Sequence, residues 1–174
     1  MRRRCALAGL TGAAALTGAA WLAGYAKGEA AQSQLRWPEL PATDLDGRPA
    51  TLLGAGGGTR IINFWALWCP PCRRELPSLE RLAAMLERRA VRVCAVALAE
   101  DGFPVREYLA QHAPRLPSVM LSPRLPVVSR LGLAALPQTF LVAADGAVLA
   151  RWTGAREWDL AGMREQLERL ARPT

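Results

Sequence analysis

Apolar residues fall into short runs and spaced series along most of the chain, and each kind of pattern predicts an element. Residues 61–65 form a run too apolar for an exposed strand, so we expect a central strand covered on both faces. After it, apolar side chains recur at helical spacing, which predicts a helix of about five turns. These residues are Leu76, Leu79, Leu82, Ala83 and Leu86.

Strand patterns then alternate with helical patterns to the end of the chain. Strands are expected at residues 91–98, 118–121, 138–143 and 147–152, the last two joined as a hairpin by the turn Asp145-Gly146. Helices are expected at residues 105–113, 127–131 and 157–170, the last with Leu160, Met163, Leu167 and Leu170 facing inward. This alternation predicts an α/β sheet.

The beginning of the chain has a different pattern. Residues 2–4 are arginines, and no charged residue follows until Lys27, which is typical of an export signal or a membrane anchor. Small residues near its end would suit cleavage by a signal peptidase, and without cleavage the segment would be a single membrane anchor with the rest of the chain outside. We therefore expect residues 1–30 to be an export signal or membrane anchor with a tether, and residues 31–174 to be one folded domain. That domain begins with a short hairpin or extension over residues 37–53.

The net charge of +7 does not indicate a nucleic-acid-binding protein. Three of the 22 basic residues lie within residues 1–26 and all 15 acidic residues lie after residue 26, which leaves 19 basic residues against 15 acidic ones, or +4. These arginines are interleaved with glutamates along helical stretches, and no basic stripe alternates with aromatic residues. We expect these charged side chains to lie on solvent-exposed faces of the helices.

Of the four cysteines, two form a close pair, Cys69 and Cys72. Four cysteines, one of them in the export segment, are too few for a disulfide scaffold. A zinc site is not expected either, because His112 is the single histidine and no second cysteine pair completes four ligands. Covalent haem attachment would need a histidine where Arg73 stands.

The pair lies between the apolar strand and the long helix, which suits redox chemistry. Cys69 would lie at the helix N-terminus, where unpaired amides and the helix dipole favour a thiolate nucleophile. Cys72, one turn later, would resolve a mixed disulfide, although a static disulfide is the alternative. Pro70 and Pro71 have no N–H to offer the Cys69 sulfur, so we hypothesise a modestly lowered pKa for Cys69 and a reducing couple.

The segment Asn63-Phe64-Trp65-Ala66-Leu67-Trp68-Cys69-Pro70-Pro71-Cys72-Arg73-Arg74-Glu75-Leu76-Pro77 resembles the active site of the TlpA/ResA-like thioredoxins. The similarity extends from about Trp37 to Leu170 and includes residues 136–140 and the Asp145-Gly146 turn. It implies a thioredoxin fold, with a central mixed sheet, flanking helices and a short N-terminal β extension. It also implies an extracytoplasmic thiol-disulfide oxidoreductase that uses Cys69 and Cys72 as its redox-active disulfide and needs no metal or organic cofactor.

The resemblance also implies a client-binding surface around the cysteines. Pro137 matches the cis-proline of this fold, and the residue before it, Leu136, would offer backbone hydrogen bonds to the client. Trp68 would flank Cys69 at the surface, together with Pro70 and Pro71, whereas Trp65 would belong to the core.

Two further positions concern proton transfer. Cytoplasmic thioredoxins carry a buried aspartate where this chain has Asn63, and an asparagine cannot shuttle a proton. Glu75 is three residues after Cys72 on the same helix face and matches the acidic residue of ResA-like reductases, so it would tune the pKa of the cysteines. A solvated glutamate in the first helical turn is the alternative. Cys94 is expected to be a small buried hydrophobe, and His112 an exposed helix residue.

The resemblance implies that the protein reduces disulfides in client proteins of cytochrome c maturation or copper-site assembly, and together with the export segment it predicts a location on the periplasmic side of the bacterial cytoplasmic membrane. A membrane electron donor of the DsbD/CcdA type would re-reduce a monomeric protein. A disulfide oxidase or isomerase is one alternative, and a copper-binding chaperone that uses the same cysteines is another. Gln138 stands in a stretch where cytochrome-maturation reductases of the CcmG type usually have an acidic residue. Its presence weakens the assignment of this chain to cytochrome c maturation.

Overall fold

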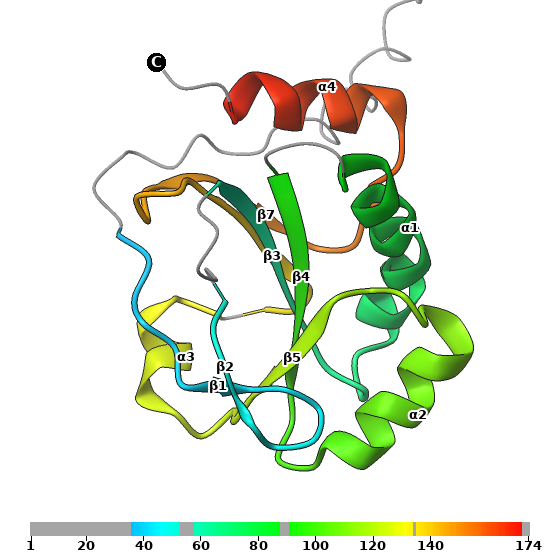
Figure 1. The fold of residues 1–174 in the computed structure, drawn as a ribbon, viewed down its shortest axis with the longest axis vertical. Helices are drawn as coiled ribbons and strands as arrows, with labels where there is room; N and C mark the ends of the chain where they lie inside the picture. The colour runs from blue at the N-terminus through cyan, green and yellow to red at the C-terminus, as the bar shows by residue number, and fades with distance from the viewer. Residues whose placement is uncertain (1–35, 53–57, 88–90, 134, 172–174) are drawn as a thin grey trace, which may run out of the picture.

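The computed structural model describes residues 36–52, 58–87, 91–133 and 135–171 of the 174-residue chain. Its strands join in one seven-stranded sheet in the order β2-β1-β5-β4-β3-β6-β7 (Figure 1). The strands are β1 (Ala42–Thr43), β2 (Pro49–Ala50), β3 (Thr59–Trp65), β4 (Val91–Leu98), β5 (Ser118–Leu121), β6 (Gln138–Val142) and β7 (Val148–Thr153). The helices are α1 (Pro70–Leu86), α2 (Gly102–His112), α3 (Pro126–Arg130) and α4 (Ala161–Leu170).

The predicted export segment falls within residues 1–35 and so lies outside the described residues. None of the helices in the described ranges is long and apolar enough to cross a membrane.

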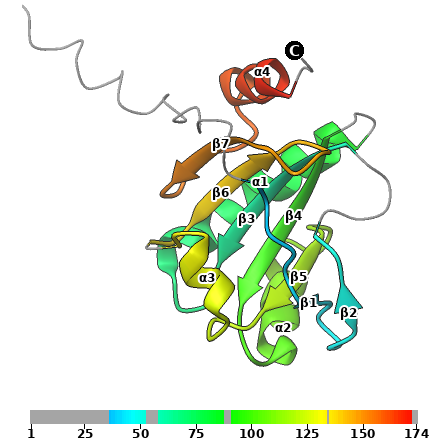
Figure 2. The same ribbon diagram turned by 90° about the vertical axis from the view of Figure 1, so that its left-hand side faces the viewer.

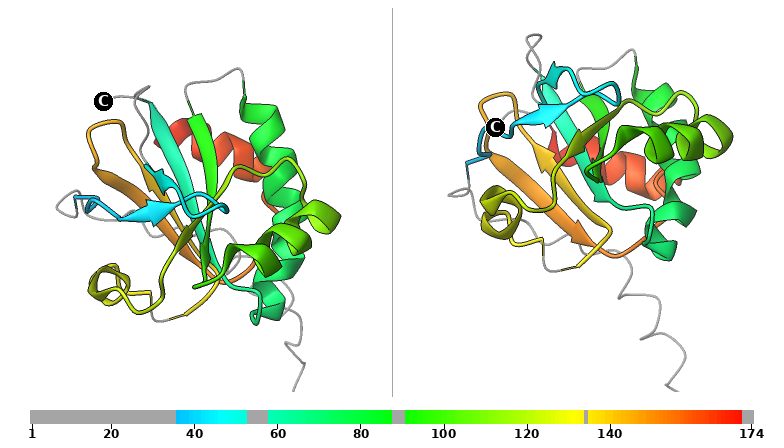
Figure 3. Two further views of the ribbon diagram at one scale, coloured as in Figure 1. Left: turned by 60° about the horizontal axis from the view of Figure 1, so that its bottom comes forward. Right: turned by 90° about the horizontal axis from the view of Figure 1, so that it is seen from below.

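β3 is the central strand, as its apolar run predicted. It pairs in parallel with β4 and antiparallel with β6, and all seven of its residues are buried. Its side chains alternate between two cores. Ile61 and Trp65 join the core that contains residues of α1, α2 and α4, whereas Ile62 and Phe64 join the core on the other face. Figure 3 shows α1 and α2 on one side of the sheet and α3 on the other.

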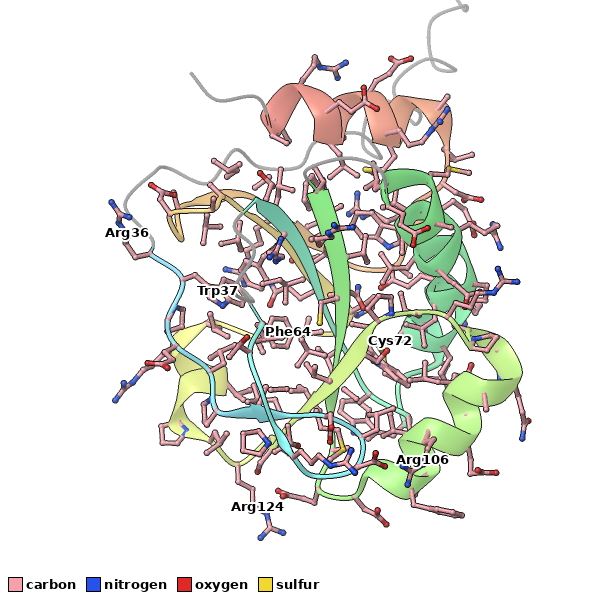
Figure 4. The ribbon with its side chains drawn as sticks, in the orientation of Figure 1. Arg36, Trp37, Phe64, Cys72, Arg106 and Arg124 are labelled. Carbon is pink, nitrogen blue, oxygen red and sulfur yellow. A yellow bond between two sulfur atoms is a disulfide. The ribbon has the colours of Figure 1, made fainter. Side chains whose placement is uncertain are left out.

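The segment before β1 covers the second face of the sheet. Trp37 packs against Phe64 and Phe140, with ring centroids 6.1 and 5.3 Å away, and Figure 4 labels Trp37 and Phe64 in this cluster. Burial of these three large rings fixes the segment on the sheet. The chain therefore enters the domain across the face opposite α1.

The predicted N-terminal β extension is confirmed. β1 and β2 form an antiparallel hairpin, and β1 adds to the edge of the sheet by pairing antiparallel with β5 through Thr43 and Met120 (Figure 2). Asp44 Oδ1 accepts hydrogen bonds from the backbone N–H groups of Asp46 and Arg48, both at 2.9 Å, and closes the turn. The turn includes Gly47, whose φ of 84° suits glycine.

Two helices begin three or more residues away from their predicted starts. α2 begins at Gly102 instead of residue 105, because the Asp101 carboxylate caps it by accepting from Phe103 N at 2.9 Å. α4 begins at Ala161 instead of residue 157, and the inward orientation predicted for Leu160 is wrong, since its side chain is 60% exposed. Trp158 inserts into the core, and its backbone N–H is bound to Ser78 Oγ. The residues before Ala161 are therefore held out of a helical conformation.

The close approach of α2 to the hairpin gives a testable prediction. A Cβ at Gly102 would overlap the Leu45 carbonyl oxygen, so Gly102→Ala should destabilise the fold by about 1–3 kcal/mol. The matched control is Gly162→Ala, where a Cβ meets nothing within 4 Å and helix propensity favours alanine. Urea unfolding midpoints of both variants measure the difference. Equal midpoints for Gly102→Ala and the unchanged protein would show that the hairpin moves aside without cost.

Candidate active site

The cysteine pair lies where β3 ends and α1 begins. A turn after Trp65 is closed by the Cys69 N–H, which donates to the Ala66 carbonyl at 3.1 Å. Cys69 is the N-cap of α1, and its Sγ accepts from the Cys72 N–H at 3.3 Å. The two sulfurs form a disulfide with the Cα atoms 5.3 Å apart. Figure 4 labels Cys72 in this first turn of α1.

Pro70 and Pro71 occupy the first two positions of α1. An N-cap side chain accepts from the N–H of the second or third helical residue. Here the second residue is proline, so Cys72, the third, supplies the hydrogen bond. The Cys69 sulfur therefore has one backbone donor where this cap geometry could provide two.

Both cysteines are buried in the disulfide form. Cys69, at the N-cap, is 3% exposed, and Cys72, inside the first turn, is 0% exposed. Beside Cys69, Trp68 is 75% exposed, whereas Trp65 is fully buried under α1. Both tryptophans are thus placed as the sequence predicted.

Pro137 stands beside this turn. Gln138, the first residue of β6, pairs with Phe64 near the end of β3, which brings the Leu136-Pro137 bond to the same end of the sheet as Cys69. That bond is cis, which confirms the predicted geometry. The Pro137 carbonyl accepts from the Gly154 N–H at 2.9 Å, while Leu136 stays half-buried against both cores.

Glu75 is buried one turn after Cys72, and the alternative of a solvated glutamate is wrong. Its side chain is 1% exposed, and its carboxylate accepts three hydrogen bonds. Asn63 Nδ2 donates to Oε1 at 2.7 Å, while the Arg156 backbone N–H and Trp158 Nε1 donate to Oε2 at 3.1 and 3.0 Å. A buried acid thus lies on the Cys72 face of α1.

Burial raises the pKa of Glu75 to about 7, because an ionised carboxylate loses water there. The hydrogen bonds from Asn63, Arg156 and Trp158 and the charge of Arg156 act in the opposite direction. A carboxyl group with a pKa near neutrality can both accept and return a proton at physiological pH. Asn63, which cannot titrate, instead orients this carboxylate and also donates to Thr139 Oγ1 at 2.8 Å.

Sequence reasoning missed several residues of this site. Trp158 was assigned to the helix expected at residues 157–170, and Arg156, Ser78 and Thr139 carried no expected role in the site. Ser78 Oγ accepts from the Trp158 N–H at 3.1 Å and donates to the Glu75 carbonyl at 2.8 Å. Of these residues, Ser78 could have been placed near Glu75 from the sequence, because the two are three positions apart on one helix. The other contacts join segments far apart in the chain.

Cys94 and His112 lie outside this site. Cys94 is half-buried on β4 and packs into the core on the face opposite the disulfide. Burial raises the pKa of its thiol to about 12, although the charge of Arg60 acts in the opposite direction. His112 is exposed at the end of α2 and stacks on Tyr108 at 4.1 Å. Within the described ranges, no three His, Cys, Asp or Glu side chains are grouped closely enough to hold a metal ion.

Comparisons with known proteins agree with this geometry. The model of the Redoxin family matches residues 26–168. The chain is 28% identical to the thiol-disulfide oxidoreductase ResA of Bacillus thuringiensis, over 75% of this chain and 72% of the relative. It is 30% identical to the protein of the same name from Geobacillus thermodenitrificans, over 67% of each chain.

A solved structure of a thiol:disulfide interchange protein of the thioredoxin family from Chlorobium tepidum has a TM-score of 0.63 and 25% identity. The match covers 79% of this chain and 98% of that one. The predicted thioredoxin fold is therefore confirmed.

Proposed function

Since this chain belongs to the Redoxin family and is a thiol-disulfide oxidoreductase, we propose that it reduces disulfides of client proteins outside the bacterial cytoplasm. The observation that carries the reducing direction is the surroundings of the Cys69 sulfur. One backbone N–H reaches it, from Cys72, because Pro70 and Pro71 have none to donate. Oxidants of this fold owe their potential to a stabilised thiolate. A weakly stabilised thiolate favours a reductant.

The proposed cycle uses both sulfurs and the buried acid. The Cys69 thiolate attacks a client disulfide, forms a mixed disulfide and releases the first client thiolate. Cys72 gives its proton to the Glu75 carboxylate and attacks the Cys69 sulfur, which closes the Cys69–Cys72 disulfide and releases the second client thiolate. Two electrons pass from the protein dithiol to the client, whose sulfurs take up two protons. A membrane electron donor of the DsbD/CcdA type then returns the pair to the dithiol.

The client would bind across the surface beside Cys69. Exposed Trp68 offers an apolar contact, with Pro70 and Pro71 on the first turn of α1. The backbone of Leu136, held by the cis bond to Pro137, would pair with the client chain next to its disulfide. The described part of this surface is compatible with clients of cytochrome c maturation and with clients of copper-site assembly.

The proposed location rests on the start of the chain. The arginines at residues 2–4 and the uncharged stretch up to Lys27 are typical of an exported or anchored bacterial protein. A reductant of this kind needs electrons delivered across the membrane, since the extracytoplasmic space is kept oxidising. The domain proposed to do the chemistry is residues 31–174.

The reduction potential of the Cys69–Cys72 pair tests this function. We expect a value nearer to the −270 mV typical of thioredoxin than to about −120 mV, the value of DsbA. Equilibration with glutathione or dithiothreitol buffers, followed by mass analysis of alkylated protein, gives the potential. A value close to that of DsbA would contradict the reductase and favour the oxidase.

Variants of the two prolines test whether the missing N–H groups set the reduction potential of the cysteine pair. Pro71→Ala restores the N–H of the second helical position, which can donate to the Cys69 sulfur, so it should lower the Cys69 pKa and make the couple more oxidising. Pro70→Ala restores the N–H of the first position, which does not reach a cap side chain, and should change the potential less. Equal shifts in the two variants would show that the cap hydrogen bond does not set the potential.

A further inference from the structure

The carboxylate of Glu75 is held by two parts of the chain that lie far from it in sequence. Asn63 on β3 reaches Oε1, and the connection between β7 and α4 reaches Oε2 twice, through the Arg156 N–H and Trp158 Nε1. The Trp158 bond is 3.0 Å long and comes from a side chain that is fully buried. On the β7–α4 connection, Arg156 therefore donates to Glu75 through its backbone and Trp158 through its side chain.

The position of the Trp158 indole is fixed from several directions. Its backbone N–H donates to Ser78 Oγ on α1 at 3.1 Å, and its ring packs edge-on against Trp152 with centroids 5.8 Å apart. The next residue, Asp159, forms an ion pair with Arg81 of α1 at 2.6 Å. The connection is therefore bound to α1 on both sides of the indole, and the indole N–H has a fixed direction toward Oε2.

We propose that Trp158 is a positioning residue for proton transfer at the dithiol, whose indole N–H holds the Glu75 carboxylate in place and sets the pH at which it accepts the Cys72 proton. This inference rests on the proposed function, in which Glu75 accepts that proton. A donor aimed at a carboxylate stabilises the ionised form, so the indole keeps the buried acid partly ionised near neutrality. Without it, burial would leave Glu75 protonated at higher pH and unable to act as the base.

Few charged or titratable groups face Glu75. β3 and β6 contribute the neutral side chains of Asn63 and Thr139. The β7–α4 connection contributes the half-buried Arg156, whose charge favours the carboxylate. On α1 itself, the thiol of Cys72 lies one turn earlier. A shift in the titration of Glu75 therefore reports on the indole bond as long as Arg156 and Cys72 are unchanged.

Trp158→Phe removes the N–H and keeps an aromatic ring in the core. The titration of Glu75 should move upward by about one pH unit, the order expected for one hydrogen bond to a charged group. The pH at which Cys72 displaces the second thiol from an aromatic disulfide probe should move with it. The titration can be followed by NMR of ¹³C-labelled glutamate, and the displacement by absorbance of the released thiolate.

Trp152→Phe is the matched control. Trp152 is equally buried and is the partner of Trp158 in the ring contact, but its indole N–H donates to no described residue. Trp152→Phe should lose a similar amount of core packing, and it should leave unchanged both the titration of Glu75 and the pH dependence of thiol displacement. If Trp158→Phe proves too unstable, benzothienylalanine at position 158 keeps the shape of the indole and lacks the N–H.

The outcomes separate this inference from the function on which it rests. In the double variant Glu75→Gln with Trp158→Phe, the profile should equal that of Glu75→Gln alone, because Trp158 acts through Glu75. If Glu75→Gln moves the profile of the unchanged protein and Trp158→Phe does not, the positioning role is refuted and the function stands. If Glu75→Gln itself moves nothing, the proton-acceptor role of Glu75 fails first.

Discussion

Cys69→Ala is expected to lower the rate of disulfide reduction by about a thousandfold or more, since it removes the attacking sulfur. No described residue can replace it. Cys72 is 0% exposed, and Cys94 lies half-buried on the opposite face of the sheet with a pKa raised to about 12 by burial. The measurement is turnover of a protein disulfide such as insulin by the reduced protein. Cys94→Ala is the control and should retain full activity.

Cys72→Ala should behave differently, because Cys69 can still attack. The mixed disulfide would persist, and expression of this variant in the native host would trap client proteins for identification by mass spectrometry. Cytochrome apoproteins or copper-site proteins among them would identify the client class. Retention of activity in Cys69→Ala, or trapping through Cys94, would overturn the assigned roles.

Glu75→Gln is expected to remove a pH dependence from both activity and stability. With the folded pKa raised by burial to about 7, above the ordinary 4.5, the folded protein holds a proton that the unfolded chain has lost between these values. The free energy of unfolding therefore falls as pH rises through this window, by about 3 kcal/mol in all for a shift of this size. Below about pH 4.5 both states are protonated, and the stabilisation is fully present.

Urea unfolding of the oxidised protein between pH 4 and pH 8 measures the effect on stability. The unchanged protein should lose stability over this range relative to Glu75→Gln, which has no proton to lose. At pH 8, the variant should also release the second thiol about a hundredfold more slowly, because Cys72 lacks its base. Glu87→Gln, at the exposed residue after α1, is the control. Parallel stability curves would show that the pKa of Glu75 is the same in the folded and unfolded states, which would contradict the upward shift.

Local patterns were sufficient for much of the fold. The run at residues 61–65 and the helical series after it predicted β3 and α1, and residues 91–98 and 118–121 matched β4 and β5 in their bounds. The cis geometry at Pro137 came from the family resemblance and is confirmed. The start of α4 was predicted wrongly, because the apolar periodicity includes Leu160 while Trp158 holds the backbone before it out of a helix. A side chain that enters the core from a loop carries no periodic signal.

Local sequence was sufficient to predict the order of elements, the place of Cys69 at the helix N-terminus and the missing N–H groups of Pro70 and Pro71, since each follows from neighbouring residues. The burial of Glu75 and its hydrogen bonds from Asn63, Arg156 and Trp158 depend on tertiary contacts. These partners lie 12, 81 and 83 residues away from it. The pKa of a side chain depends on the water it loses and the donors it gains, and both are set by whichever distant segments pack over it.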